Sequence, residues 1–331
     1  MKLSLQAGLS LILVSGTLLI FPNDQAVEKA AGGLVPKREP RVAMKKERLT
    51  ISPKRIRVEY EFVNESSNDV VTDIAFPIPE YRYPGDFRNE SFSDFKLWIN
   101  DQPASFAIDA RAFVSGKDET EILKKNGITI ETFGGFDYEK AVFRNGKDFF
   151  PDYEVNALPQ SVKDELVMRG LVERPDTPYY LAPLWSVRKA YYWTQRFPPG
   201  QTVHIRHEYA PIFGFNRISV KSLQEGPRKT CMDKDLLFSK TAMAKHMDIY
   251  HDDFPFCWVK YILTSANTWK TPINDFELVT EVALPVYGSF SAPKLISFCW
   301  QGKAKISDSG RLLLNEHNFV PTEELTIYFF W

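Results

Sequence analysis

The chain has 331 residues, 44% of them hydrophobic and 14% aromatic, so it can bury a large core as one large domain or two smaller ones. Its net charge of −1 excludes a field that would attract nucleic acid or an anionic membrane, and no basic cluster is interleaved with aromatic residues. We therefore expect no nucleic-acid partner.

The N-terminus has the pattern of an export signal, with a positive charge at Lys2 and an apolar stretch from Leu9 to Phe21. At about 13 residues this stretch is shorter than the roughly 20 that span a bilayer as a helix, which favours a cleaved signal over a permanent anchor. We place the signal peptide at residues 1–26. Its cleavage site stays open because Pro22 and Asp24 are poor residues near a cut, so an uncleaved, membrane-tethered form is the alternative. No later stretch predicts a second span.

Residues 27–115 are predicted to be rich in β-strands. Apolar and charged residues alternate from Arg55 to Asn64, and after a polar turn a second apolar run follows from Val70 to Phe76. These two runs predict a β-hairpin. A further hairpin is expected between Phe95–Ile99 and Ser105–Ile108.

Residues 116–183 are predicted to form a small helical insertion. A capping pattern that begins at Asp118 precedes the expected helix Thr120–Lys125. A second helix is expected from Ser161 to Arg169, because Gly170 follows directly as a helix-ending residue.

Residues 184–331 are predicted to be β-rich again. Trp185 to Pro211 reads as a hairpin that turns at Pro198–Gln201, and a helix capped by Asp233 is expected after it. The remaining strands are short and β-branched or aromatic. They are expected at Phe256–Thr264, Phe276–Val282, Leu295–Trp300, Lys303–Ser307, Leu312–Asn315 and Leu325–Trp331.

The first strand of the second hairpin carries the best candidates for ligand binding. One face presents Tyr191 and Trp193, and the other presents Tyr192. One face is enough for a core, so a sheet with an uncovered side here would expose aromatic rings beside Arg188, Lys189 and Arg196, which suits sugar stacking or a protein interface. The alternative is that all these rings are buried.

Catalytic and metal-binding patterns are weak. His204 and His207 are three apart on a predicted strand and therefore point to opposite faces, so they cannot share a metal. His246 and His251 lie near several aspartates, but their spacing fits no known metal loop. No nucleophile elbow or phosphate loop is present. We expect no metal and no cofactor, and a non-enzymatic protein is favoured over an enzyme.

The chain contains three cysteines, Cys231, Cys257 and Cys299. In an oxidising compartment this odd number predicts one disulfide and one spare thiol.

Several short motifs, in order along the chain, resemble one family of exported bacterial proteins. They are Asn23-Asp24, Ala31-Gly32-Gly33-Leu34, Val58-x-Tyr60-x-Phe62-x-Asn64, Ala75-Phe76-Pro77-x-Pro79, Tyr192-Trp193-x-Gln195-x-Phe197-Pro198-x-Gly200, His207-x-Tyr209-x-Pro211, Cys231-x-Asp233, Asn267-x-Trp269 and Ser297-Phe298-Cys299. With these motifs the chain resembles the domain of unknown function 4424 (DUF4424) family.

The resemblance implies a mainly β fold with antiparallel, immunoglobulin-like β-sandwiches, and export to the periplasm of a Gram-negative bacterium. It also implies a disulfide between Cys231 and Cys299, which lie at matched motifs, with Cys257 left free. It implies no catalytic residues. We therefore expect a non-enzymatic envelope protein that binds another exported protein or an envelope polysaccharide, and a hydrolase acting on an envelope polymer is the alternative.

Overall fold

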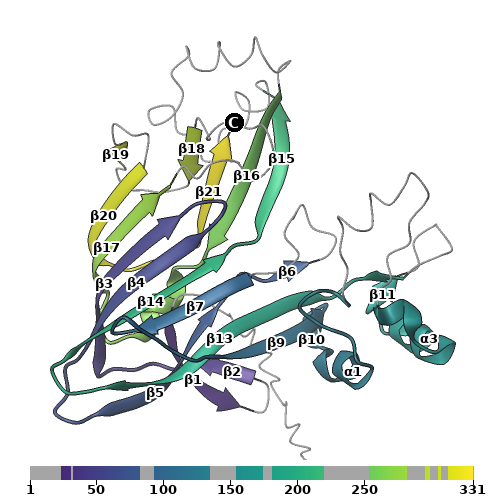
Figure 1. Ribbon diagram of the computed structural model, residues 1–331, viewed down its shortest axis with the longest axis horizontal. Helices are drawn as coiled ribbons and strands as arrows, with labels where there is room; N and C mark the ends of the chain where they lie inside the picture. The colour runs from purple at the N-terminus through teal and green to yellow at the C-terminus, as the bar shows by residue number, and fades with distance from the viewer. Residues whose placement is uncertain are drawn as a thin grey trace, which may run out of the picture.

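The computed structural model describes residues 24–30, 33–82, 93–134, 154–173, 181–219, 253–281, 295–298, 305–306 and 312–330. These residues form a mainly β protein, as predicted, with two large sheets, two smaller sheets and short helices at one end (Figure 1). The helix expected after Asp233, the residues His246 and His251, and both Cys231 and Cys299 lie outside the described residues.

The larger sheet has eight strands, and it contains the strand that the alternation from Arg55 to Asn64 predicted. In spatial order its strands are β19 (Lys305–Ile306), β20 (Leu312–Phe319), β17 (Ile273–Thr280), β3 (Val42–Ile51), β4 (Ile56–Asn64), β14 (Thr202–Ala210), β7 (Ser93–Ile99) and β8 (Gln102–Pro103). β17 and β3 pair in parallel, whereas the other strands of this sheet pair antiparallel.

The second large sheet has seven strands, all paired antiparallel. Its order is β10 (Lys117–Asp118), β9 (Ala107–Val114), β13 (Ser186–Phe197), β5 (Val70–Pro77), β1 (Gln25–Ala30) and β2 (Gly33–Pro36), with β6 (Tyr81–Arg82) also beside β13.

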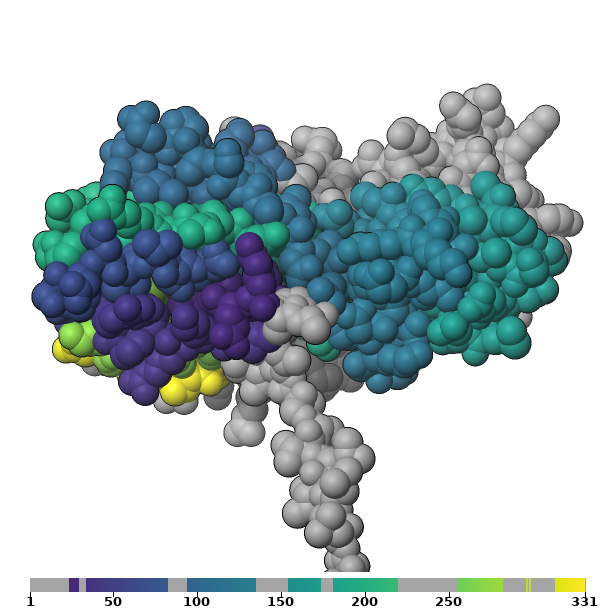
Figure 2. All heavy atoms as spheres, turned by 90° about the horizontal axis from the view of Figure 1, so that it is seen from below, coloured from purple at the N-terminus to yellow at the C-terminus, as the bar shows by residue number. Residues whose placement is uncertain are grey.

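A four-stranded sheet and the helices complete the described structure. The four-stranded sheet consists of β15 (Phe213–Ser219), β16 (Asp253–Tyr261), β21 (Leu325–Phe330) and β18 (Leu295–Phe298). The helical segment consists of α1 (Thr120–Lys125), the 3-10 helix η1 (Glu154–Ala157), α3 (Gln160–Met168) and the paired strands β11 (Val172–Glu173) and β12 (Ala182–Pro183). A second 3-10 helix, η3 (Thr264–Thr268), follows β16. The two helices predicted within residues 116–183 are thus confirmed, and Figure 2 shows their segment at one end of the molecule, away from the N-terminal strands in purple.

The two strongest predicted hairpins are wrong as hairpins. β4 and β5 follow each other across a polar turn, yet they lie in different large sheets, and β13 and β14 separate in the same way. A chain that crosses between two facing sheets has the same local pattern of strand, turn and strand as a hairpin, so the pattern predicts strands but not their partners. β4 pairs with β3 and β14, and β5 pairs with β13 and β1.

The hairpin expected between Phe95–Ile99 and Ser105–Ile108 also differs from the structure. β7 turns at Asn100 and Asp101, both with positive φ, and pairs with the two-residue strand β8. The chain then leaves this sheet and continues as β9 in the other one. Asn and Asp tolerate the left-handed conformation that such a tight turn requires, which explains why the turn forms there.

Asn64 holds the two crossings between the sheets together. Its side-chain amide donates hydrogen bonds to the carbonyl oxygens of Asn68 (2.7 Å) and Phe197 (2.8 Å), and its own carbonyl accepts one from the N–H of Gly200 (2.8 Å). Gly200 has φ of +64°, a conformation that glycine adopts without steric cost. The crossings therefore lie side by side, and a fully buried amide joins them.

Aromatic rings fill the space between the two large sheets. Phe95 of β7 stacks on Tyr191 of β13 with ring centroids 3.9 Å apart, and Phe76 of β5 packs on Tyr209 of β14 at 5.4 Å. Each such pair contributes about 0.5–1.5 kcal/mol beyond the area it buries. The large sheets thus pack face to face through a shared core.

Candidate binding surface

The aromatic residues expected at an exposed surface lie mostly in this core. Tyr191 and Trp193 are 2% and 5% exposed, so for these two rings the structure has the buried arrangement that the sequence left as the alternative. β13 belongs to one of two sheets that pack face to face, and the side chains on its inward face form part of the core between them.

Tyr192 lies on the other face of β13 and is half-buried. Its ring packs against a small apolar cluster of Val27, Ala75 and Ala190, and the Nζ atom of Lys29 lies 5.1 Å from the ring centroid. Tyr192 is therefore the one member of the predicted set that keeps access to solvent.

A buried polar network connects the start of the described chain to the core. The carboxylate of Asp24 lies 3.3 Å from Nε2 of His207, and Nε1 of Trp269 donates to the carbonyl oxygen of Asp24 at 2.6 Å. Burial raises the pKa of Asp24, and His207 offsets part of this shift. Because Asp24 and His207 are fully buried, they fix the N-terminal segment in the fold and do not meet a ligand.

The two histidines of β14 point to opposite faces, as predicted. His207 is fully buried between the sheets, whereas His204 is exposed on the outward face. Within the described part of the chain, no three His, Cys, Asp or Glu side chains are placed to hold a metal ion. Cys257 is a free and fully buried thiol, and burial raises its pKa.

The outward face of the eight-stranded sheet carries charges whose sign alternates from strand to strand. One row across the sheet consists of Glu277 of β17, Arg48 of β3, Glu59 of β4, Arg206 of β14 and Trp98 of β7. The adjacent row consists of Asp275, Lys46, Glu61 and His204. Opposite charges on neighbouring strands attract, so this pattern supports the register of the sheet.

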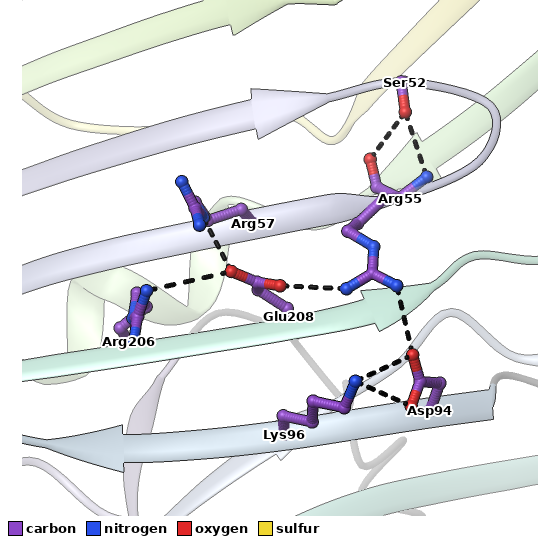
Figure 3. A network of polar contacts seen from close by, with 7 residues as sticks. All are labelled: Ser52, Arg55, Arg57, Asp94, Lys96, Arg206 and Glu208. Atoms are coloured by element: carbon purple, nitrogen blue, oxygen red, sulfur yellow. Dashed lines mark hydrogen bonds and ion pairs between the residues drawn. The ribbon is translucent and has the colours of Figure 1, made fainter. Parts of the chain in front are cut away.

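One part of this face, which we call the arginine network, is tied together by ion pairs (Figure 3). One carboxylate oxygen of Glu208 lies 2.7 Å from Nε of Arg57, and the other lies 2.9 Å from Nη1 of Arg55. Nη2 of Arg55 lies 3.1 Å from the carboxylate of Asp94, and this carboxylate also pairs with Lys96. Burial raises the pKa of Glu208, but the hydrogen bonds from Arg57 and Arg55 more than offset this, so its pKa lies below the usual range. The network's charged groups are thus largely occupied with each other.

Beside the arginine network the same face is hollowed into a groove of about 280 Å³. We call it the Trp98 groove. Its charged and aromatic lining residues are Lys46, Arg48, Glu59, Glu61, Trp98, Asp101, His204 and Arg206.

Trp98 and Arg206 form the central contact of the groove. The guanidinium carbon of Arg206 lies 4.1 Å from the centroid of the Trp98 ring, and its Nη1 atom lies 3.9 Å from Glu208. Stacking on an aromatic ring holds the planar guanidinium in one orientation. Nε of Arg206 has no hydrogen-bond partner among the residues that the structure describes.

The sequence predicted most of the strands that form this groove, but it did not predict that their side chains meet. Arg206 and His204 were predicted on a strand, and Trp98 in another, yet nothing in the sequence indicated that these strands are neighbours. The turn at Asn100 joins them directly, because its N–H donates to the carbonyl of His204 at 2.8 Å and its side chain accepts from the His204 N–H at 2.9 Å.

Fold and surface together define a mainly β protein with a large double-sheet core and a charged groove on one sheet. The chain belongs to the DUF4424 family, a domain of unknown function, whose model matches residues 22–328. It is also similar to a solved structure described as a "putative nutrient binding protein" from Legionella pneumophila, at 14% identity and a TM-score of 0.42, over 93% of this chain and 70% of that one. The search of curated proteins found no match.

Proposed function

We propose that this protein is an exported, non-enzymatic binding protein of the Gram-negative periplasm that holds an envelope polymer in the Trp98 groove. The observation that carries the proposal is the stacked pair of Trp98 and Arg206 at the centre of an open, charge-lined groove. Tryptophan and arginine are the side chains that most often dominate binding energy, especially when one orients the other.

The groove supports a polymer more than a compact ligand. It lies on a broad sheet face, and the rows of alternating charge extend past it to Glu277 and Asp275 on β17. An extended chain can follow such rows, whereas a small molecule is usually enclosed by its pocket.

Export and the disulfide belong to the same proposal. The apolar stretch near the N-terminus supports export, and in the periplasm Cys231 would pair with Cys299 while Cys257 stays reduced. The complete burial of Cys257 supports its free state. Peptide mapping of the periplasmic protein without reduction tests the pairing, and a linkage through Cys257 would refute it.

The immunoglobulin-like arrangement is likewise proposed. Two facing sheets, chain crossings between them and mostly antiparallel pairing support it.

No helix among the described residues has the length and apolar character needed to cross a membrane.

Sedimentation with insoluble envelope polymer tests the function. Wild-type protein should sediment with the polymer, and Trp98→Ala should weaken this by at least about tenfold, because an aromatic anchor contributes more than about 1.4 kcal/mol. Tyr192→Ala is the matched control, since Tyr192 is a half-buried ring on the outward face of the other large sheet. Equal sedimentation of wild type and Trp98→Ala would refute the proposal.

The rival function is hydrolysis of an envelope polymer, and the groove offers one carboxylate pair for it. Glu59 and Glu61 are two apart on β4, so their carboxylates lie on one face of the strand, and glycosidases use two carboxylates that flank the scissile bond. Release of soluble sugar during the sedimentation assay, abolished by Glu59→Gln or Glu61→Gln, would favour the enzyme.

A further inference from the structure

The Trp98 groove is balanced in charge. Three of its lining residues carry a positive charge and three carry a negative one. The cations are Lys46, Arg48 and Arg206, and the carboxylates are Glu59, Glu61 and Asp101. Because the two signs come from neighbouring strands, no end of the groove collects one sign alone.

Most of these charged groups are not engaged with each other. Among the described residues, Lys46, Glu59, Glu61 and Asp101 make no ion pair and no side-chain hydrogen bond, and Arg48 pairs outside the groove, with Glu277 at 3.5 Å. The neighbouring arginine network shows the contrasting case, in which each carboxylate is held by two or more cations. The groove therefore offers unpaired carboxylates beside one unpaired ammonium group, that of Lys46.

Sugar hydroxyl groups match such a lining. A hydroxyl donates one hydrogen bond and accepts others, so it can bridge a carboxylate such as Glu61 and a cation such as Lys46 on the next strand. Hydrogen bonds to charged partners are stronger than neutral ones. The Trp98 ring and the flat guanidinium of Arg206 add a surface on which the apolar face of a sugar ring can pack.

An acidic or basic polymer fits less well. Its repeated charges would meet a like charge on every second strand, and repulsion there cancels the attraction on the strands between. The groove also lacks the single-sign field that steers charged polymers.

We propose that the ligand of the Trp98 groove is a polysaccharide without net charge. This inference rests on the proposed function. Its binding depends on hydrogen bonds and ring packing, so the affinity changes less than about twofold when the salt concentration rises tenfold.

Competition in the sedimentation assay tests the ligand class. Deproteinised envelope polysaccharide is separated by anion exchange into an unretained, uncharged fraction and a retained, acidic fraction, and each is added to wild-type protein and insoluble polymer. The uncharged fraction should displace the protein, equally at low and high salt. Glu59→Gln with Glu61→Gln should lower the affinity at least about tenfold, because both acceptors are weakened.

The outcomes separate the two proposals. If only the acidic fraction displaces the protein, or neither fraction does, the inference about the ligand is wrong while Trp98-dependent sedimentation still supports the function. If sedimentation does not depend on Trp98, the proposed function itself fails. Tyr192→Ala serves again as the control that should behave like wild type.

Discussion

The two faces of β14 differ in what their side chains contact. On the inward face, His207 and Tyr209 are fully buried among rings from both large sheets. On the outward face, His204 and Arg206 line an open groove. Since successive residues of a strand alternate between faces, one segment of sequence serves stability on one side and, in our account, recognition on the other. Substitutions on the two faces should therefore separate loss of stability from loss of binding.

The largest effect is expected on the inward side, at Asp24. Asp24→Ala removes the carboxylate that faces His207 in a fully buried site and should destabilise the protein by roughly 3–5 kcal/mol, the range for breaking a buried pair. Denaturant unfolding measures this. In the double variant Asp24→Ala with His207→Leu, much of the loss should be recovered, because no unpaired polar group remains. An equally unstable double variant would show that the pair is not the cause.

The same contacts bear on how the chain is processed. Asp24, Gln25 and Ala26 are at most 3% exposed, and β1 pairs with β5 from Gln25 onward. A chain that starts at residue 27 should therefore be less stable than one that starts at residue 22, and the natural mature protein should retain Asp24. Mass spectrometry of the exported protein checks this, and a mature N-terminus at residue 27 would contradict it.

A smaller loss is expected at the crossing between the sheets. Asn64→Ala removes the amide that joins the carbonyl of Phe197 to the turn at Asn68, and with it the buried hydrogen bond to Phe197. The expected cost is about 1–3 kcal/mol. Asn68→Ala is the control, because the bond uses the backbone of Asn68 and its exposed side chain can be lost without effect. Similar stabilities of the two variants would argue against the role of Asn64.

On the outward face, the arginine network should contribute less to the free energy of unfolding. Glu208→Gln weakens its pairs with Arg55 and Arg57, whose side chains are each 45% exposed, so we expect a loss of about 1 kcal/mol or less. Urea unfolding at low and high salt measures it, since salt should reduce the difference between the variant and wild type. A loss as large as that of Asp24→Ala would erase the contrast between the two faces.

The smallest effect depends on pH. Hydrogen bonds from Lys270 and Lys45 lower the pKa of Glu65 to about 2. A lowered pKa stabilises the fold above the unfolded value of about 4.5, and this contribution is lost as the pH falls from there toward 2. The stability difference between wild type and Glu65→Gln should be less than about 1 kcal/mol at neutral pH, because the site is largely exposed, and should shrink on acidification. A difference that grows at low pH would contradict this assignment.

How far the sequence predicts this structure depends on the range of the interactions. The alternation of Ile56, Val58, Tyr60 and Phe62 is local, and it correctly predicted a strand with one buried face. Strand β3 was not predicted, because a bulge between Met44 and Lys46 breaks its alternation. The pairing partners were missed because a crossing and a hairpin share one local pattern.

The candidate site was beyond the sequence for the same reason. Lys46, Glu59, Trp98 and Arg206 come from four strands, and their meeting depends on the strand order alone. The aromatic run at Tyr191 was a stronger local signal, but the facing sheet covers Tyr191 and Trp193, so this signal marked the core.

Fluorine NMR of protein labelled with 5-fluorotryptophan tests most directly whether the outward face binds the ligand. The chain has seven tryptophans, and the signal of Trp98 is assigned from its absence in Trp98→Phe. When deproteinised envelope polysaccharide is added, the Trp98 signal should shift or broaden, while the signals of the buried Trp185 and Trp269 stay unchanged. Binding of the polysaccharide that leaves the Trp98 signal unaltered would contradict the account.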